Sequence, residues 1–180
     1  MVRLPAMLEQ HHSVTFYEDE AFLFESVVPF LRAGLRAKGT AIAVAASEHC
    51  KEFEKELAAW NLTGQNRLVV MDGREALSRF MVNDWPSEPA FLSCFEDLVA
   101  EASAAGPVSI FGEMVAILWD EDKWKAAIRL EEIWNRLAGR YLFSLLCAYP
   151  LGAFKQEEHT DAFLDICGVH SRIILTSACR

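Results

Sequence analysis

The stretch SVTFYEDEAFLFESVVPFLRAGL, residues 13–35, decides the fold class because a β-branched run passes directly into an apolar helical pattern. In many α/β proteins a junction of this kind contains a glycine-rich loop that holds a phosphate group. Here the junction is Tyr17-Glu18-Asp19-Glu20, which is acidic and contains no glycine. Carboxylates at a helix start interact favourably with the helix dipole and repel an anionic ligand. The junction therefore predicts a neutral or cationic ligand.

The alternation of strand and helix continues along the chain. Short apolar runs without strict alternation are typical of strands that are covered on both faces of a parallel sheet. Such runs occur at residues 14–17, 40–46, 67–71, 108–111 and 141–148. Helical stripes with i, i+3, i+4 spacing lie between them. The sequence predicts a three-layer α/β fold with a mostly parallel central sheet of five or more strands and helices on both faces.

The length of 180 residues fits one domain with a sizeable core. We expect a single domain over residues 1–180, with a flexible N-terminus at 1–11 and a C-terminal tail at 171–180. Pro29 is expected to kink or restart the first helix near Val28. A closing helix is expected at residues 161–168.

Composition excludes several classes of function. The net charge of −9 disfavours direct binding to nucleic acid, which requires clustered lysine and arginine. The apolar runs are too short for a membrane span and the N-terminus has no leader pattern, so we expect a cytoplasmic protein. The five cysteines are widely spaced without a C-x-x-C pair, so neither a metal nor a cofactor is expected. His11 and His12 could bind metal or sense pH, but a structural role is favoured because they precede the first strand, at the end opposite the expected ligand crevice.

Residues that follow the strands are the best candidates for a binding site, because ligands of parallel α/β sheets bind beyond the carboxyl ends of the strands. Such a site would have apolar walls and a few orienting polar groups. The candidate ligand-binding residues are Tyr17, Glu18, His49, Asp72, Gly112, Glu113, Met114, Trp119, Cys147 and Tyr149. Glu113 either faces the crevice or begins a helix and points to water. No catalytic residue is assigned, since Cys147 has no identifiable base and residue order shows no catalytic triad.

The segment GLRAKGT, residues 34–40, has the glycine spacing of a phosphate loop. No lysine follows Gly39, and the segment leads from a helix into a strand, which is the reverse of the required order. We interpret it as a helix C-terminus and a turn.

Five motifs carry a family resemblance. They are H-x-x-x-F-Y-E-D-E at residues 12–20, FLRAGLRAKG at 30–39, FGEMVAILW at 111–119, RLEEIWNRLA at 129–138 and SLLCAYP at 144–150. Together they closely resemble the MEDS domain, the sensory domain of methanogens, methylotrophs and the dichloromethane-responsive regulator. The resemblance implies a ligand-sensing module for small hydrocarbon derivatives, often joined to a histidine kinase or a DNA-binding region. It also implies a RecA-like relative of KaiC-type ATPases without the phosphate loop.

We therefore expect a non-catalytic sensor that binds a small neutral organic ligand and signals through a partner, either a histidine kinase or a transcription regulator, with homo-oligomer formation possible. The alternative is a protein-interaction adaptor that keeps the fold and binds no ligand. A third hypothesis, a nucleotide hydrolase or a hydrolase with Glu113 as its base, is disfavoured because the phosphate-binding lysine and glycines are absent.

Overall fold

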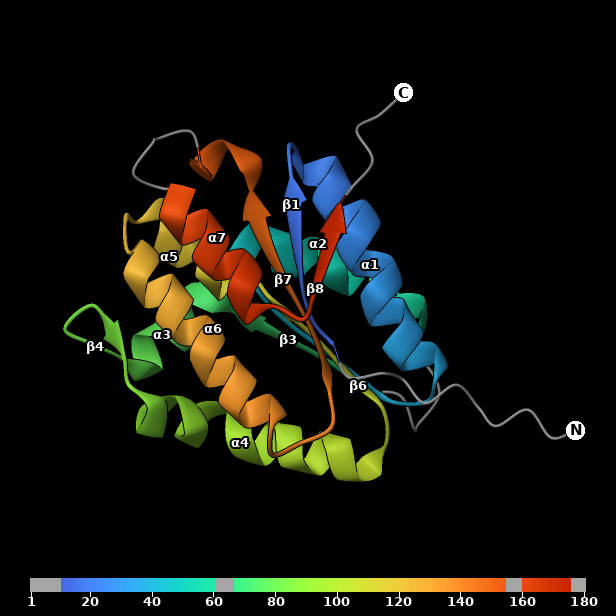
Figure 1. The fold of residues 1–180 in the computed structure, drawn as a ribbon. Coiled ribbons are helices and arrows are strands. Elements are labelled where there is room, and N and C mark those ends of the chain that lie inside the picture. Colours follow the sequence, from blue (N-terminus) through green and yellow to red (C-terminus); the bar gives the residue numbers. More distant parts are fainter. Residues whose placement is uncertain (1–10, 61–66, 155–159, 176–180) are drawn as a thin grey trace, which may run out of the picture.

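The central sheet contains six parallel strands in the order β3-β2-β6-β7-β1-β8. The computed structural model describes residues 11–60, 67–154 and 160–175 (Figure 1). The strands of the sheet are β1 His12–Tyr17, β2 Thr40–Ala45, β3 Arg67–Asp72, β6 Val108–Gly112, β7 Ser144–Pro150 and β8 Arg172–Leu175. This confirms the predicted α/β class and the largely parallel sheet.

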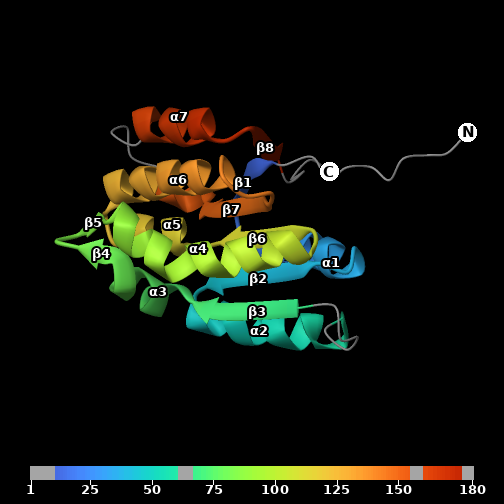
Figure 2. The same ribbon diagram turned by 90° about the horizontal axis from the view of Figure 1, so that it is seen from below.

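Helices cover both faces of the sheet, which completes the three layers (Figure 2). The helices α1 Glu20–Arg36 and α2 Ser47–Leu57 pack on one face. The other face carries α3 Gly73–Phe80, α4 Glu88–Ala105, α5 Met114–Asp120, α6 Trp124–Ala138 and α7 Thr160–Val169. Short elements complete the described chain: the 3-10 turns Ala58–Trp60 and Leu151–Phe154, and an antiparallel ribbon of β4 Met81–Val82 and β5 Trp85–Pro86.

The strand β2 shows how both faces of the central sheet are covered by apolar packing. Its residues are all buried, and side chains alternate between the two faces of a strand. Ile42 and Val44 belong to the core beneath α3 to α7, whereas Ala41, Ala43 and Ala45 face α1 and α2. Small side chains on the second face allow the two helices to approach the sheet closely.

Three details differ from the expectations. The helix α1 continues through Pro29 without restarting at Val28, and Pro29 is exposed, so the carbonyl that loses its hydrogen bond can be solvated. The strand expected at 141–148 occupies residues 144–150. The expected tail contains β8, which pairs with β1 at the edge of the sheet. The described part of the chain has no helix with the length and apolarity of a membrane span.

Candidate functional site

Glu113 joins the ends of two neighbouring strands. It lies between the end of β6 and the start of α5, and its backbone N–H donates to the carbonyl of Val44 at 2.9 Å. Its Oε2 accepts the backbone N–H of Ala46 at 2.9 Å. The side chain is only 3% exposed. Glu113 therefore points into the protein at the carboxyl edge of the sheet, and not into water.

His49 on α2 is held by this carboxylate. Its Nδ1 lies 2.8 Å from Oε1 and 3.0 Å from Oε2 of Glu113. Because a carboxylate accepts, Nδ1 donates the hydrogen bond. This bond raises the pKa of His49 above its ordinary value despite the opposing effect of burial, and the charges of Glu113, Glu20 and Glu48 act in the same direction as the bond.

The other ring nitrogen of His49 is buried and has no hydrogen-bond partner among the described residues. Oε1 of the exposed Glu20 lies 3.7 Å from Nε2 and forms a long ion pair with the ring when the imidazole is protonated. The ring of Phe24 lies edge-on to the imidazole, with 5.3 Å between the centroids. His49 thus presents one free polar atom between an apolar ring and an exposed carboxylate.

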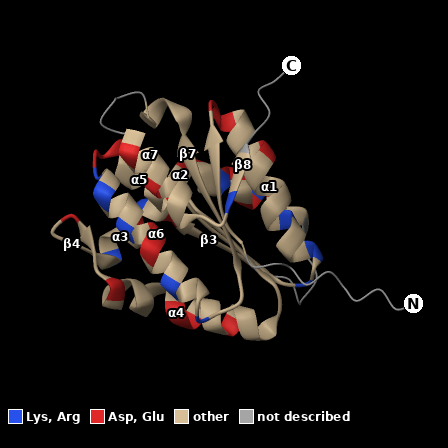
Figure 3. Cartoon of the chain, viewed as in Figure 1, with Lys and Arg blue, Asp and Glu red and all other residues tan. Residues whose placement is uncertain are grey.

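Tyr17, at the end of β1, is half-buried beside the same acidic groups. Burial raises the pKa of its phenol well above the usual range, and the charges of Glu113, Glu20 and Asp120 raise it further. Tyr17 is therefore a neutral hydroxyl surrounded by carboxylates. Glu18 is exposed, and acidic residues gather at the start of α1 (Figure 3).

Three helix starts at this edge are occupied by carboxylates of the chain itself. Asp19 caps α1 by accepting the N–H of Phe22 at 3.1 Å, and Asp72 caps α3 by accepting the N–H of Glu75 at 2.9 Å. The start of α2 has no side-chain cap within the described part of the chain, but Glu113 accepts the N–H of Ala46, the residue directly before the helix. Backbone N–H groups at helix starts are the usual binding places for anions. Here each of the three helix starts already has a carboxylate beside it.

Ser47 and Asp72 connect α2 to the end of β3. Ser47 is the first helical residue of α2, and its hydroxyl donates to Asp72. This hydroxyl and the N–H of Glu75 lower the pKa of Asp72. Asp72 also lines a hollow of about 210 Å³ between β3, α3 and α4. A second hollow, of about 190 Å³, lies between α3 and α5.

The remaining predicted residues lie deeper in the protein. Gly112, Met114 and Trp119 are buried in the core around α5. The indole N–H of Trp119 donates to the carbonyl of Ala153 at 3.1 Å, and its ring packs on Tyr149. The structure therefore brings together Tyr17, His49 and Glu113, but it places these apolar residues beneath them.

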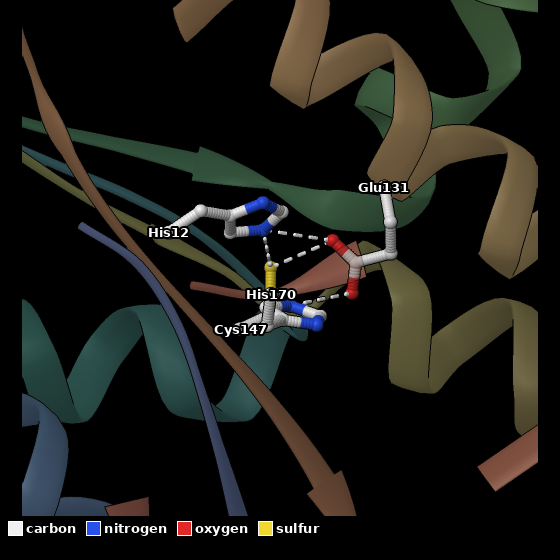
Figure 4. Close-up of side chains that lie close together, drawn as sticks. All are labelled: His12, Glu131, Cys147 and His170. Atoms are coloured by element: carbon white, nitrogen blue, oxygen red, sulfur yellow. Dashed lines mark hydrogen bonds and ion pairs between the residues drawn. The ribbon is translucent and has the colours of Figure 1, made fainter. Parts of the chain in front are cut away.

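Cys147 and Tyr149 belong to a different site, a buried polar cluster formed with His12, Glu131 and His170. Glu131 accepts hydrogen bonds from the thiol of Cys147 at 3.2 Å and from the hydroxyl of Tyr149 at 2.9 Å. Its Oε2 lies 3.1 Å from Nε2 of His12, and its Oε1 lies 3.3 Å from Nε2 of His170. Glu131 and Cys147 are both 0% exposed. Figure 4 shows four of these side chains pointing toward one another.

The charge of Glu131 dominates the electrostatics of this buried polar cluster. Burial acts to raise the pKa of Glu131, but the charge of His170 and the contacts with both histidines lower it, so its pKa lies well below the usual range. Burial, and then the charge of Glu131, raise the pKa values of the Cys147 thiol and the Tyr149 phenol well above normal. Burial lowers the pKa of His170, but Glu131 raises it by more.

Sequence reasoning missed His12, Glu131 and His170 as partners. One signal was available for Glu131: it lies on the buried stripe of α6 beside Leu130 and Trp134, where a carboxylate needs a partner. His12 was considered for metal binding or pH sensing, but a structural role was favoured for it. His170 offered no signal, since it lies between two elements far away in the sequence.

Comparisons with known proteins give one match. The model of a protein family, described as MEDS, the methanogen/methylotroph, DcmR sensory domain, matches residues 11–170. No curated protein and no solved structure matches the chain significantly.

Proposed function

The chain belongs to the MEDS family of sensory domains, and we propose that it is a non-catalytic sensor that binds a small neutral organic molecule at the carboxyl ends of its strands. The observation that carries this proposal is the buried Nε2 of His49, which has no hydrogen-bond partner among the described residues. A buried polar atom without a partner is costly, so a ligand that supplies the missing hydrogen bond gains affinity.

The charge of the site supports a neutral ligand. Carboxylates of the chain already occupy the starts of α1, α2 and α3, so a phosphate would meet negative charge where it needs free N–H groups. A hydroxyl or amine on a short hydrocarbon could instead bond to Nε2 of His49 while its apolar part contacts Phe24. Tyr17 and Glu113 would orient the same ligand from the ends of β1 and β6.

Signalling requires a further interaction after ligand binding, because binding of a small ligand changes only the domain that binds it. We infer that a partner protein of the histidine kinase or transcription regulator class, or a second copy of the chain, receives the signal. The support is the sensory character of the family. Sedimentation of the chain with and without ligand distinguishes the two routes, since self-assembly changes its mass in the absence of any partner.

A thermal-shift screen tests the ligand proposal. The panel contains small alcohols, amines and halogenated hydrocarbons, with ATP and Mg²⁺ as the anionic comparison. At a ligand concentration about a hundredfold above the dissociation constant, binding stabilises the fold by about 2.7 kcal/mol. We expect saturable stabilisation by a neutral member of the panel and none by ATP.

The variant His49→Gln separates specific binding from solvent effects. It removes the imidazole Nε2 and should weaken ligand binding at least about tenfold, as expected for loss of about 1.4 kcal/mol. The matched control is Glu56→Gln, an exposed carboxylate near the far end of α2, which should bind as the parent chain does. Saturable stabilisation by ATP alone, or equal affinity in His49→Gln and the parent chain, would contradict the proposal.

A further inference from the structure

The buried polar cluster brings four metal-ligating side chains together from four elements. His12 begins β1, Glu131 lies on α6, Cys147 lies in β7, and His170 joins α7 to β8. One donor atom from each of the four lies within 4.8 Å of all the others. All four side chains are buried. His12 and Tyr17 lie at opposite ends of β1, so this site is separate from the proposed ligand site.

Hydrogen bonds fix which nitrogen of each histidine faces the centre. Asn135 donates from Nδ2 to the carbonyl of Val169 at 2.8 Å, so its Oδ1 must be the acceptor for Nδ1 of His12, also at 2.8 Å. Nδ1 of His170 lies 2.6 Å from the carbonyl of Ile166, which can only accept. Both histidines therefore carry a proton on Nδ1. In the neutral imidazole, Nε2 then presents a lone pair.

Those lone pairs point at the carboxylate of Glu131, which also offers only lone pairs. The separations are 3.1 Å for His12 and 3.3 Å for His170. Neutral histidines in these positions would repel Glu131 in a fully buried site. A positive charge among these atoms, either extra protons or a metal ion, is required to make the arrangement favourable.

We propose that His12, Glu131, Cys147 and His170 form a binding site for a zinc-type divalent metal ion. Zinc binds nitrogen, oxygen and thiolate ligands at about 2.0–2.3 Å in a tetrahedron, which requires ligand atoms roughly 3.3–3.8 Å apart. The recorded separations are 3.1 Å for His12 Nε2 to Glu131 Oε2, 3.2 Å for Cys147 Sγ to Glu131 Oε2, and 3.5 Å for Cys147 Sγ to His12 Nε2. Small side-chain shifts complete the geometry.

The charges balance when the metal binds. Cys147 releases its thiol proton to solvent as the Zn–S bond forms, and Glu131 is already a carboxylate. Two negative ligands and two neutral imidazoles then cancel the two positive charges of the ion, so the buried site is neutral overall. A neutral site avoids the large cost of an uncompensated charge in the protein interior.

The supporting contacts are those of a metal site. Metal-bound histidines usually donate their second N–H to a carbonyl or carboxylate, as Asn135 and the Ile166 carbonyl permit here. Tyr149 holds the free oxygen of Glu131. A metal ion with four protein ligands has no open coordination position for water or substrate, which favours a structural role over a catalytic one. Such an ion would tie β1 and β7 to α6 and to the α7–β8 junction.

The test uses the full chain without an affinity tag, purified from zinc-supplemented cells. Elemental analysis should find about one zinc ion per chain, and a strong chelator should lower the melting temperature in a way that added Zn²⁺ reverses. Cobalt added to the metal-free chain should give the thiolate charge-transfer band and the intense visible absorption of tetrahedral Co²⁺.

Variants assign the ligands. Cys147→Ser should abolish the thiolate–cobalt band, whereas Cys50→Ser, a half-buried thiol on α2, should leave it unchanged. His170→Gln should weaken zinc binding at least about tenfold. If Cys147→Ser does not fold, the cobalt spectrum of the parent chain still decides the matter. A parent chain without bound metal and without a thiolate–cobalt band would overturn the proposal. It would indicate that extra protons on the histidines balance the charge of Glu131.

Discussion

His49 donates from Nδ1 to the carboxylate of Glu113 at 2.8 Å, across the space between α2 and the junction of β6 with α5. This contact links two of the strand–helix junctions at the carboxyl edge of the sheet. It also contributes to the pH dependence of the stability of the fold.

The first prediction concerns this pH dependence. The hydrogen bond to Glu113 raises the pKa of His49, and the negative charges of Glu20 and Glu48 act in the same direction. The folded chain therefore binds the proton more tightly than the unfolded chain. The stabilisation is fully present below the unfolded pKa of about 6.5 and is lost as the pH rises through the raised folded pKa.

Urea unfolding of the parent chain and His49→Gln, between about pH 5.5 and pH 9, checks the sign. The difference in unfolding free energy between the two chains should be largest at the acidic end and decline with rising pH. Taking this difference removes contributions from other titrating groups. A difference that is constant or grows with pH would show that His49 is not stabilised as a cation.

The second prediction concerns Glu113 itself. Glu113→Gln keeps an oxygen for the N–H of Ala46 but loses the charge opposite His49. The loss of a buried charge-assisted hydrogen bond should lower the unfolding free energy by about 2 kcal/mol near pH 6. The control Glu56→Gln, at an exposed position of α2, should change it by less than about 0.5 kcal/mol.

A double-mutant cycle with His49→Gln isolates the pair. We expect a coupling energy of about 1 kcal/mol or more between His49 and Glu113, because the two side chains are in direct contact. Additive effects of the two substitutions would mean that each residue is stabilised by other contacts.

The third prediction concerns the Gly-x4-Gly segment that resembles a phosphate loop. A Cβ atom on Gly39 would lie 1.9 Å from the carbonyl oxygen of Pro107, and one on Gly34 would lie 2.7 Å from the Ser109 hydroxyl. These glycines are needed for close packing of the α1–β2 turn against the start of β6. Gly39→Ala should therefore lower the unfolding free energy by about 3 kcal/mol.

Gly168→Ala is the matched control for that substitution. Gly168 is an exposed helical residue of α7, and a Cβ atom there would meet nothing within 4 Å. The replacement should stabilise the fold by up to about 1 kcal/mol, because alanine has the higher helix propensity. Equal effects of the two substitutions, measured by urea unfolding, would contradict the packing explanation.

Most of the fold could be predicted from local sequence patterns. A buried parallel strand needs a continuous apolar run, and each of the five predicted runs forms a strand of the sheet. The strand β8 was missed because its four residues, RIIL, follow the last helix near the chain end. Its pairing with β1 depends on a contact between opposite ends of the chain, which no local pattern reveals.

Some of the site residues could likewise be placed from the local sequence, whereas others depend on contacts between distant parts of the chain. His49, Asp72 and Glu113 could be placed at one edge because each lies at the end of a strand or shortly after it. Cys147 was placed there because the strand was expected to end at residue 148, whereas β7 continues to Pro150 and Cys147 lies within it. The proximity of Cys147 to His12 and His170 arises only because β1 lies between β7 and β8.

The last prediction concerns the cap of α3. Asp72 accepts the N–H of Glu75 at 2.9 Å and the hydroxyl of Ser47, so it both begins α3 and holds it to α2. Asp72→Ala should lower the unfolding free energy by about 1 kcal/mol, the usual cost of losing an N-cap. Asp72→Asn keeps an oxygen acceptor and should retain most of that stability.

The same pair of variants also tests the role of charge. Ser47 and the N–H of Glu75 lower the pKa of Asp72, so its stabilising contribution is present at neutral pH and is lost as the pH falls through that lowered pKa. The unfolding free energy of the parent chain should therefore fall in acid as Asp72 becomes protonated. The unfolding free energy of Asp72→Asn should depend less on pH over the same range. Equal destabilisation by alanine and asparagine at neutral pH would show that the carboxylate charge, and not the cap oxygen, stabilises the start of α3.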